Sequence, residues 1–557
     1  MYWRSKDFVG GPAGALTRAL YKGMGYSDKD LSKPIIGVVN SYSTVCPGQF
    51  NLNQLAQCVR EGIWAGGGMP VEFGTIGPCD GIAQGHNGMK YILPSRDIIA
   101  NSVELMAQAH QLDGLVLLGS CDKIVPGMLM VAARLDLPTI VVNGGPMYSG
   151  EYKGEFYDVN TIEVATGAFK AGKISEKEFK EIEDCVCPGP GSCQMIGTAN
   201  TMSCLTEALG MSLPGSATIP AVAAKRMVVA RESGSQIIEL IEKGVTAGKI
   251  LTKEAIDNAI RVGLAIGGST NLILHILALA YEAEVELDIE RFDLLSEETP
   301  YIASLVTASK YDMVDFHRSG GIPTVMQELL PLLNKDCLTV TGKTVAENLV
   351  ALDPPKPDGI IIKTLANPVK PTGGLAVLKG NLAPGTGIAK PAAIPEDRLV
   401  CKGPARVFNS EEELIAAIHQ KQIQPGDMLV VRYEGPKGGP GMREMYTPLK
   451  LLEGYGLAKD VFLITDGRFS GSNKGGFIGH ICPEAAEGGP IAVVDNGDII
   501  SIDINQRLLQ LEISEIDLAK RLEQWTPPAP KITKGYLALY AQTVQAANKG
   551  AIVAIEK

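Results

Sequence analysis

The chain has 557 residues, of which 45% are hydrophobic and 20% charged, a composition typical of a globular protein with more than one core. Its formal net charge of −11 argues against nucleic acid and anionic membrane surfaces, because both need clustered Lys and Arg. The longest apolar helical stretch, 271–280, is far shorter than the roughly 20 residues of a membrane span. Eleven cysteines without a signal-peptide-like start predict reduced thiols or metal ligands in a cytoplasmic enzyme.

From residue 33 to about residue 350, strand-like and helix-like segments alternate. Short apolar runs predict buried strands at 34–40, 115–119 and 139–142. The stretches between and after them predict helices at 53–62, 98–110 and 126–135. This order favours a parallel sheet with helices on both faces. The charged segment 170–184 predicts an exposed helical arm.

The character of the chain changes at 353–359, a Pro-rich stretch that predicts a linker. Beyond it, Gly and Pro separate short strand candidates at 359–363, 375–378, 428–432, 461–465, 491–494 and 499–504. Few long helices lie between them, which favours a barrel. The sequence therefore predicts an α/β protein with an N-terminal parallel-sheet α/β domain over 1–352 and a C-terminal β-barrel-like domain over 353–557.

The tripeptide Cys121-Asp122-Lys123 follows a predicted strand, at the kind of strand end where α/β proteins bind ligands. Thiolate sulfur prefers iron, whereas carboxylate oxygen prefers magnesium or manganese. Two neighbouring ligands with opposite preferences indicate a site for two kinds of metal. The alternative for the tripeptide alone is a buried cysteine beside a surface Asp–Lys pair.

A second group of thiols, Cys185, Cys187 and Cys193, lies on a loop rich in Gly and Pro. The spacing is not that of a structural zinc site, which usually has C-x₂₋₄-C pairs and four ligands. An iron–sulfur cluster that also uses Cys121 agrees better with the pattern. The alternative is a set of unligated thiols on a loop.

Further acids supply oxygen ligands of the kind that magnesium prefers: Asp80 in a turn and Glu444 after a Gly-rich run, together with Asp122. Each acid taken alone is more typical of a solvated turn. Ser470 follows the predicted strand 461–465, but its surroundings are not the G-x-S-x-G of hydrolases. A phosphate loop and a dinucleotide-binding G-x-G-x-x-G are also missing from the sequence.

The chain resembles the dihydroxy-acid dehydratase / phosphogluconate dehydratase family from about Lys33 to its C-terminus. Long motifs carry the resemblance in a fixed order: Asp80-Gly-Ile-Ala with Gly85-His-Asn-Gly-Met89, Cys121-Asp-Lys-Ile-Val-Pro-Gly-Met-Leu-Met130, Gly191-Ser-Cys193 with Thr198-Ala-Asn-Thr-Met202, Gly267-Gly-Ser-Thr-Asn271, Gly320-Gly-Ile-Pro323, Asp466-Gly-Arg-Phe-Ser-Gly471 and Pro483-Glu-Ala-Ala-Glu-Gly-Gly-Pro490. The Arg-Phe-Ser-Gly form favours the branched-chain members over the sugar-acid members.

The resemblance implies a role for each matching residue. Cys121 and Cys193 would ligate an iron–sulfur cluster. Magnesium would be bound by Asp80, Asp122, Lys123 as a carboxylated lysine, and Glu444. Ser470 would be the catalytic base. The family also implies an N-terminal α/β region, a C-terminal β-barrel and assembly as a homodimer or a dimer of dimers.

One departure from the family concerns the third cluster ligand. Members with a two-iron cluster carry a cysteine where this chain has Gly48, and Cys46 falls two positions earlier. Members with a four-iron cluster have Pro-Gly there, as this chain does. Cys46 and Cys187 both stay possible third thiolates, and both a [4Fe-4S] and a [2Fe-2S] cluster stay possible.

The reaction that the resemblance implies is dehydration of 2,3-dihydroxy-3-methylbutanoate and 2,3-dihydroxy-3-methylpentanoate to 2-oxo acids, a step of valine and isoleucine biosynthesis. The nearest alternative is a dehydratase of the same family that acts on sugar acids (aldonates). A more distant alternative is a non-catalytic iron–sulfur sensor. The presence of Asp80, Asp122, Glu444 and Ser470 argues against a sensor, which needs only the thiols.

Overall fold

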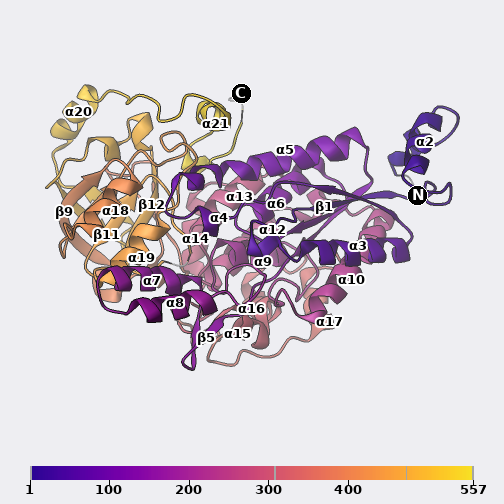
Figure 1. Ribbon diagram of the computed structural model, residues 1–557, viewed down its shortest axis with the longest axis horizontal. Coiled ribbons are helices and arrows are strands. Elements are labelled where there is room, and N and C mark those ends of the chain that lie inside the picture. The colour runs from indigo at the N-terminus through magenta and orange to yellow at the C-terminus, as the bar shows by residue number, and fades with distance from the viewer. Residues whose placement is uncertain (1–2, 307–308, 472, 555–557) are drawn as a thin grey trace.

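The computed structural model describes residues 3–306, 309–471 and 473–554. In Figure 1 most of the first 350 residues form one side of the molecule, and most of the later chain (orange to yellow) forms the other, with helices α7 (Val159–Lys170) and α8 (Glu176–Cys185) lying beneath the later chain. The last helix, α21 (Tyr536–Thr543), returns over the junction between the two sides.

The first region is built on four parallel strands: β1 (Ile35–Asn40), β2 (Met69–Gly74), β3 (Gly114–Gly119) and β4 (Thr139–Asn143). Their order in the sheet is β2-β1-β3-β4. β1, β3 and β4 are buried along their whole length, which is why apolar runs predicted them correctly. β2 was missed, because this edge strand is only half-buried and contains Pro70 and Glu72.

Helices pack around this sheet and bury its strands. α6 (Ile124–Leu135) packs on β3 and β4, and α3 (Leu52–Gly66) and α10 (Ala224–Lys243) pack on strands of the same sheet and on each other. A Cβ atom on Gly62 of α3 would lie 2.0 Å from the Arg231 carbonyl oxygen, so this glycine permits the close approach of α3 and α10. The predicted helices at 53–62, 98–110 and 126–135 are confirmed as α3, α5 (Pro94–Ala109) and α6.

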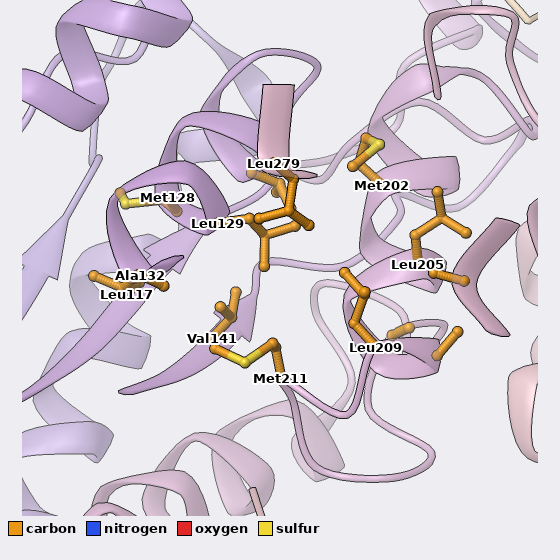
Figure 2. Close-up of a cluster of buried hydrophobic side chains, with 14 of the residues drawn as sticks. Leu117, Met128, Leu129, Ala132, Val141, Met202, Leu205, Leu209, Met211 and Leu279 are labelled. Carbon is orange, nitrogen blue, oxygen red and sulfur yellow. The ribbon is translucent and has the colours of Figure 1, made fainter. Parts of the chain in front are cut away.

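The main core lies where α6, β3 and β4 meet α9 (Thr198–Ala208) and α13 (Asn271–Glu282). Figure 2 shows side chains from these elements directed toward one another, including Leu117, Leu129, Met202 and Leu279. Each of the four is at most 1% exposed. This packing fixes the start of α9 and the start of α13 relative to the end of β3.

The C-terminal region contains an eight-stranded sheet in the order β14-β13-β9-β10-β11-β12-β8-β7. The middle strands β9 to β12 are parallel, and the outer pairs are antiparallel. A bridge between Lys379 and Leu508 connects the two edges, so the sheet curls into a barrel. The predicted α/β region and barrel-like region are confirmed. The strands are β7 (Ala376–Leu378), β8 (Thr386–Ala389), β9 (Val400–Phe408), β10 (Met428–Val431), β11 (Phe462–Thr465), β12 (Gly476–Cys482), β13 (Ile499–Asp503) and β14 (Leu508–Leu511).

Two predicted strands were wrong. Residues 491–494 largely form a 3₁₀ turn, Pro490–Val493, whose buried apolar side chains resemble those of a buried strand. At 359–363, the Asp358 carboxylate accepts hydrogen bonds from the amides of Ile360, Ile361 and Ile362, which bends the chain into a turn. The only ladder contact described there is a single bridge between Ala303 and Ile362.

The charged arm is a helical hairpin, α7 (Val159–Lys170) and α8 (Glu176–Cys185). Gly167 of α7 packs closely on Gly454 of α19 (Tyr446–Tyr455), so the arm also joins the two regions. At the other end of the chain, the Arg96 guanidinium donates to the carbonyls of Gly550 (3.0 Å) and Ala551 (2.8 Å). The division into domains near residue 353 stays a prediction.

The described ranges also contain the buried helix α12 (Lys253–Ala265), a two-stranded hairpin, and several shorter helices and 3₁₀ turns. None of the helices in these ranges is both long and apolar enough to cross a membrane. The remaining helices and strands are α1 (Ser5–Val9), α2 (Ala15–Gly23), α4 (Asp80–Ala83), β5 (Gly150–Tyr152), β6 (Glu155–Tyr157), α11 (Ala247–Ile250), α12 (Lys253–Ala265), α14 (Glu290–Glu298), α15 (Met313–Arg318), α16 (Gly321–Leu329), α17 (Val345–Leu352), α18 (Glu411–His419) and α20 (Glu515–Gln524). The 3₁₀ turns are η1 (Pro47–Gln49), η2 (Asn87–Tyr91), η3 (Leu330–Leu332), η4 (Pro391–Ala393), η5 (Glu396–Arg398), η6 (Ala485–Glu487) and η8 (Ala547–Lys549).

Candidate active site

Three neighbouring parallel strands end at one edge of the N-terminal sheet, and the loop after each carries a cysteine. Cys46 follows β1, Cys79 follows β2 and Cys121 follows β3. Because the carboxyl ends of parallel strands meet at the same edge, these loops converge. Cys193 approaches from the segment that leads into α9.

The thiols of this edge form a group. The sulfur atoms of Cys46 and Cys121 are 3.5 Å apart. Cys46 also shares a hydrogen bond with Cys79, and the charge of Cys79 acts on the pKa of Cys193. Cys187 is exposed on the surface, yet its charge also acts on the pKa of Cys193. The predicted Cys46 and Cys121 therefore lie together, with Cys193 and Cys187 nearby, and Cys79 is a further neighbour that the sequence analysis did not assign.

All four thiols are held in the protonated form. The hydrogen bond with Cys121 and burial raise the pKa of Cys46, and the hydrogen bond with Cys46 and burial raise that of Cys79. The same hydrogen bond favours the Cys121 thiolate, yet burial and the Asp80 charge leave its pKa at about 11. Burial raises the pKa of Cys193 well above the ordinary thiol value. Thiols of this kind ionise when a metal ion replaces the proton.

Gly48 lies directly against this group. A Cβ atom at Gly48 would be 2.2 Å from the sulfur of Cys121. The loop therefore has no room for a side chain at position 48 while Cys121 holds its place.

The predicted magnesium ligands lie beside the thiols. Asp122 and Lys123 follow β3, both are buried, and the Lys123 ammonium donates to the Asp122 carboxylate. Burial, followed by the charges of Asp122 and Glu444, raises the pKa of Asp80 to about 8. The three acids are thus close enough to repel one another. Burial, followed by the Arg468 charge, lowers the pKa of Lys123.

Glu444 comes from the C-terminal region but reaches into this acid group. It forms a buried ion pair with Arg468. The amide nitrogens of Gln84 and Asn271 donate to its two carboxylate oxygens, each at 3.2 Å. Glu444 is therefore held by the loop after β2, by the start of α13 and by the loop after β11.

Ser470 lies in the loop after β11, and its neighbours are pinned from both regions. The Thr270 hydroxyl donates to the Phe469 carbonyl (3.2 Å), and the buried Lys390 ammonium donates to the Gly471 carbonyl (2.7 Å). A Cβ atom on Gly471 would be 2.8 Å from the Ser269 Cα, so this loop lies directly on the start of α13. The Ser269 hydroxyl in turn contacts that of Thr198 at the start of α9 (2.9 Å).

The site is therefore a junction at which both regions meet. Thr198 hydrogen-bonds Asn271 (2.8 Å), and Asn271 hydrogen-bonds Glu444. A continuous set of contacts thus runs from the Ser470 loop to the acids. The sequence located these residues on separate segments, and the fold brings them together.

Comparison with known proteins shows the family to which the chain belongs. Two family models match the chain, "Dihydroxy-acid/6-phosphogluconate dehydratase N-terminal" over residues 33–348 and "Dihydroxy-acid/6-phosphogluconate dehydratase C-terminal" over residues 360–551. The chain belongs to the dihydroxy-acid/6-phosphogluconate dehydratase family. The resemblance found in the sequence is confirmed.

Curated relatives match this family member over nearly its whole length. A protein of Acetivibrio thermocellus named dihydroxy-acid dehydratase is 52% identical over 538 residues, which cover 96% of this chain and 97% of the relative. A protein of the same name from Pyrococcus furiosus is also 52% identical over 538 residues, with the same coverage of both chains. One from Desulfosudis oleivorans is 50% identical over 555 residues, covering 99% of each chain.

The site of this dehydratase-family member offers sulfur donors, which suit soft metal ions, and oxygen donors, which suit hard ones. Across residues 3–306, 309–471 and 473–554, no three His, Cys, Asp or Glu side chains converge as ligands of one metal ion. Instead, Asp122 and Glu444 are paired with Lys123 and Arg468. The side-chain oxygens of Gln84 and Asn271, however, are buried without a hydrogen-bond donor in the described part of the chain. Such oxygens, next to three acids, suit a magnesium ion.

Two buried histidines, His275 and His480, lie near the same charges. Burial, Arg468 and Lys123 lower the pKa of His480 to about 3, and burial, Lys123 and Arg96 lower that of His275. Both rings are therefore neutral. His480 has a φ of 56° within β12, and its backbone amide donates to the Gly467 carbonyl (2.8 Å). The spacing of the histidines in the sequence did not indicate that His480 lies near the site.

Proposed function

We propose that this chain is a dihydroxy-acid dehydratase, which removes water from 2,3-dihydroxy-3-methylbutanoate and 2,3-dihydroxy-3-methylpentanoate. The products are the 2-oxo acids from which valine and isoleucine are made. The observation that carries the proposal is the identity of 50–52% to relatives of that name over at least 96% of the chain. The meeting of sulfur and oxygen donors in one place supports it.

The acid group would hold magnesium through Asp80, Asp122 and Glu444. Lys123 would join them as a carbamate, because an ammonium beside the ion would be repelled whereas a carbamate is an anionic oxygen ligand. Magnesium in this place would stabilise the negative charge that develops when a proton leaves the carbon next to a carboxylate. Gln84 and Asn271 would orient Glu444 through their hydrogen bonds.

Ser470 would take the proton from C2 of the substrate. A serine hydroxyl is normally far too weak a base, so the alkoxide needs positive charge nearby. Arg468 is two residues away in the same loop, and the Lys390 ammonium donates to the carbonyl of the next residue. As Ser470 takes the C2 proton, the C3–oxygen bond breaks and its electron pair leaves with the oxygen. The departing hydroxide takes up a proton and is released as water, so the overall loss is one water molecule. The resulting enol takes a proton at C3 and becomes the 2-oxo acid, so no electron is transferred.

The thiols would hold an iron–sulfur cluster through Cys121 and Cys193, and the sequence leaves Cys46 and Cys187 as alternatives for a third thiolate. The sulfur of Cys46 is 3.5 Å from that of Cys121. The cluster would supply a Lewis acid that makes the C3 hydroxyl a better leaving group. Protonated, buried thiols in one group suit this role, because each loses its proton only when it binds iron. Assembly as a homodimer or a dimer of dimers and a cytoplasmic location stay predictions.

The test is an assay of full-length, anaerobically purified protein that has been loaded with iron, sulfide and Mg²⁺. We expect release of 2-oxo acid from 2,3-dihydroxy-3-methylbutanoate with kcat/KM at least a hundredfold above that for gluconate. Preference for gluconate would support a sugar-acid dehydratase instead. No turnover of either acid by cluster-loaded protein would leave a non-catalytic iron–sulfur sensor.

A further inference from the structure

Asp466 and Glu484 belong to two of the motifs that carry the family resemblance, but the function proposed above uses neither of them. Asp466 directly follows β11, and Glu484 lies in the loop after β12. β10, β11 and β12 are parallel neighbours, so the loops that follow them leave the barrel at one edge. The loop after β10 carries Glu444, and the loop after β11 carries Ser470. Both acids therefore lie beside loops of the candidate active site.

The Asp466 carboxylate connects all three loops. Its Oδ1 accepts a hydrogen bond from the amide of Glu434 (2.9 Å), and its Oδ2 accepts from the amides of Tyr433 (3.0 Å) and Ala485 (2.9 Å). Asp466 is fully buried. Buried amides that lose their acceptor are costly, so this carboxylate strongly favours the observed arrangement of the loops.

The Glu484 carboxylate holds the next part of the loop after β10. Its two oxygens accept from the amides of Lys437 and Gly438, each at 2.8 Å. A Cβ atom on Gly435 would be 2.5 Å from Glu484 Oε2, so the loop lies directly on this carboxylate. The two acids together accept five backbone amides, four of them from residues 433–438.

The anchored segment 433–438 in turn holds Glu444. The Arg443 amide donates to the Glu434 carbonyl (3.1 Å). The backbone of Arg468 bonds to both neighbours of Glu444, because its amide donates to the Arg443 carbonyl (3.0 Å) and its carbonyl accepts from the Met445 amide (2.8 Å). Arg468 lies midway between the anchoring aspartate and the proposed base, so one set of backbone contacts aligns the magnesium ligand with the base.

We propose that Asp466 and Glu484 are positioning residues for the dehydration. Asp466 fixes the loops of both Glu444 and Ser470, whereas Glu484 fixes only the loop of Glu444. Both carboxylates bind backbone amides, so they act through the loops and not on the reactants. The inference rests on the proposed function, in which Glu444 binds magnesium and Ser470 is the base.

Asp466→Asn and Glu484→Gln test the proposal, because each keeps the size of the side chain but replaces one accepting oxygen by an NH₂ group. The matched control is Asp113→Asn. The buried Asp113 carboxylate also accepts backbone amides, those of Ser5 (2.8 Å) and Ile35 (2.7 Å). It directly precedes β3, at the opposite edge of the N-terminal sheet from the thiols.

Each full-length protein is loaded with iron and sulfide without oxygen and titrated with Mn²⁺, which prefers the same oxygen ligands as Mg²⁺. Free Mn²⁺ is measured by electron paramagnetic resonance. We expect at least tenfold weaker Mn²⁺ binding in Asp466→Asn and Glu484→Gln, with the iron content of wild type. At saturating Mg²⁺, kcat for 2,3-dihydroxy-3-methylbutanoate should fall at least tenfold in Asp466→Asn but less than threefold in Glu484→Gln. Asp113→Asn should match wild type in both measurements.

Mn²⁺ binding within twofold of wild type in either variant would overturn the role of that residue. Equal kcat in the two variants would overturn the link between Asp466 and the Ser470 loop. Weaker Mn²⁺ binding in Asp113→Asn as well would mean a general loss of stability and would overturn the proposal. If Asp466→Asn does not fold, Mn²⁺ binding by Glu484→Gln decides.

Hydrogen exchange of the metal-free proteins gives a measurement that does not depend on the reaction. The amides of 433–438 should exchange at least tenfold faster in both variants than in wild type, while those of β1 keep their rate. Equal acceleration throughout the chain would overturn the proposal. A wild-type chain that binds no Mn²⁺ and releases no 2-oxo acid would instead refute the proposed function, and the exchange rates would still show whether the two acids hold the loop.

Discussion

The two regions of this molecule contribute to the site in different ways. The N-terminal sheet delivers its side chains from loops that directly follow buried strands, so Cys121 and Asp122 are fixed by the packing of β3 and α6. The C-terminal barrel delivers Glu444 and Ser470 from longer loops, which hydrogen bonds to the N-terminal region hold in place. The first region would therefore supply the thiols and most of the magnesium ligands, and the second would add Glu444 and the base Ser470.

The largest effect should come from substitution of Cys121, which the N-terminal region supplies. Cys121→Ser removes a central thiolate, so we expect loss of both the visible absorption of the cluster and all measurable activity. Cys401→Ser in β9 is the matched control and should keep both. Iron content is the deciding measurement, and a Cys121→Ser protein with wild-type iron would contradict the ligand assignment.

Substitution of Ser470 should separate the contribution of the base from that of the cluster. Ser470→Ala removes the base, whose effect is typically a hundredfold or more in rate, and should leave the cluster absorption intact. Steady-state turnover and absorption are measured on the same sample, with Ser501→Ala in β13 as the control. Activity above a tenth of wild type would refute the role of Ser470.

Glu444 comes from the C-terminal region but would bind magnesium together with acids of the N-terminal region. Its substitution should therefore weaken magnesium binding and leave the cluster unchanged. Glu444→Gln takes away one anionic ligand, and we expect at least a tenfold higher Mg²⁺ concentration for half-maximal activity, with unchanged iron content. The exposed Glu515→Gln is the control. A variant that loses iron instead would mean that the sulfur and oxygen groups are not independent.

The smallest effect concerns Lys390, which supports the Ser470 loop from the barrel. Burial lowers its pKa from 10.5 to about 7, a shift that corresponds to a cost on the order of 4 kcal/mol for the charged form. Between pH 7 and pH 10.5 the unfolded chain binds the extra proton, so this group makes stability rise with pH. In Lys390→Met that contribution disappears, and the melting temperature of the cluster-free protein should rise less between pH 7 and pH 9 than in wild type. Equal slopes would contradict a Lys390 ammonium whose pKa is lowered by burial.

The sequence predicted strands correctly where burial on both faces produces a continuous apolar run. Strands buried on both faces, such as β3, appear as apolar runs whatever surrounds them. β9 and β12 were missed because their Gly, Pro and polar residues fit a curved barrel and mask any regular pattern. The apolar run at 491–494 was read as a strand because burial gives a 3₁₀ turn the same composition.

By itself, the sequence determined the family, the two fold types and the candidate ligands Cys121, Asp122 and Lys123, because this tripeptide is a local feature. The tertiary structure alone decided that Gln84, Asn271 and Arg468 surround Glu444, and that the sulfurs of Cys46 and Cys121 lie 3.5 Å apart. These partners are far apart in sequence and meet only because β2, β1 and β3 end at one edge and the barrel loops pack against it. Adjacency across a sheet depends on strand order, which residue type and spacing do not encode locally.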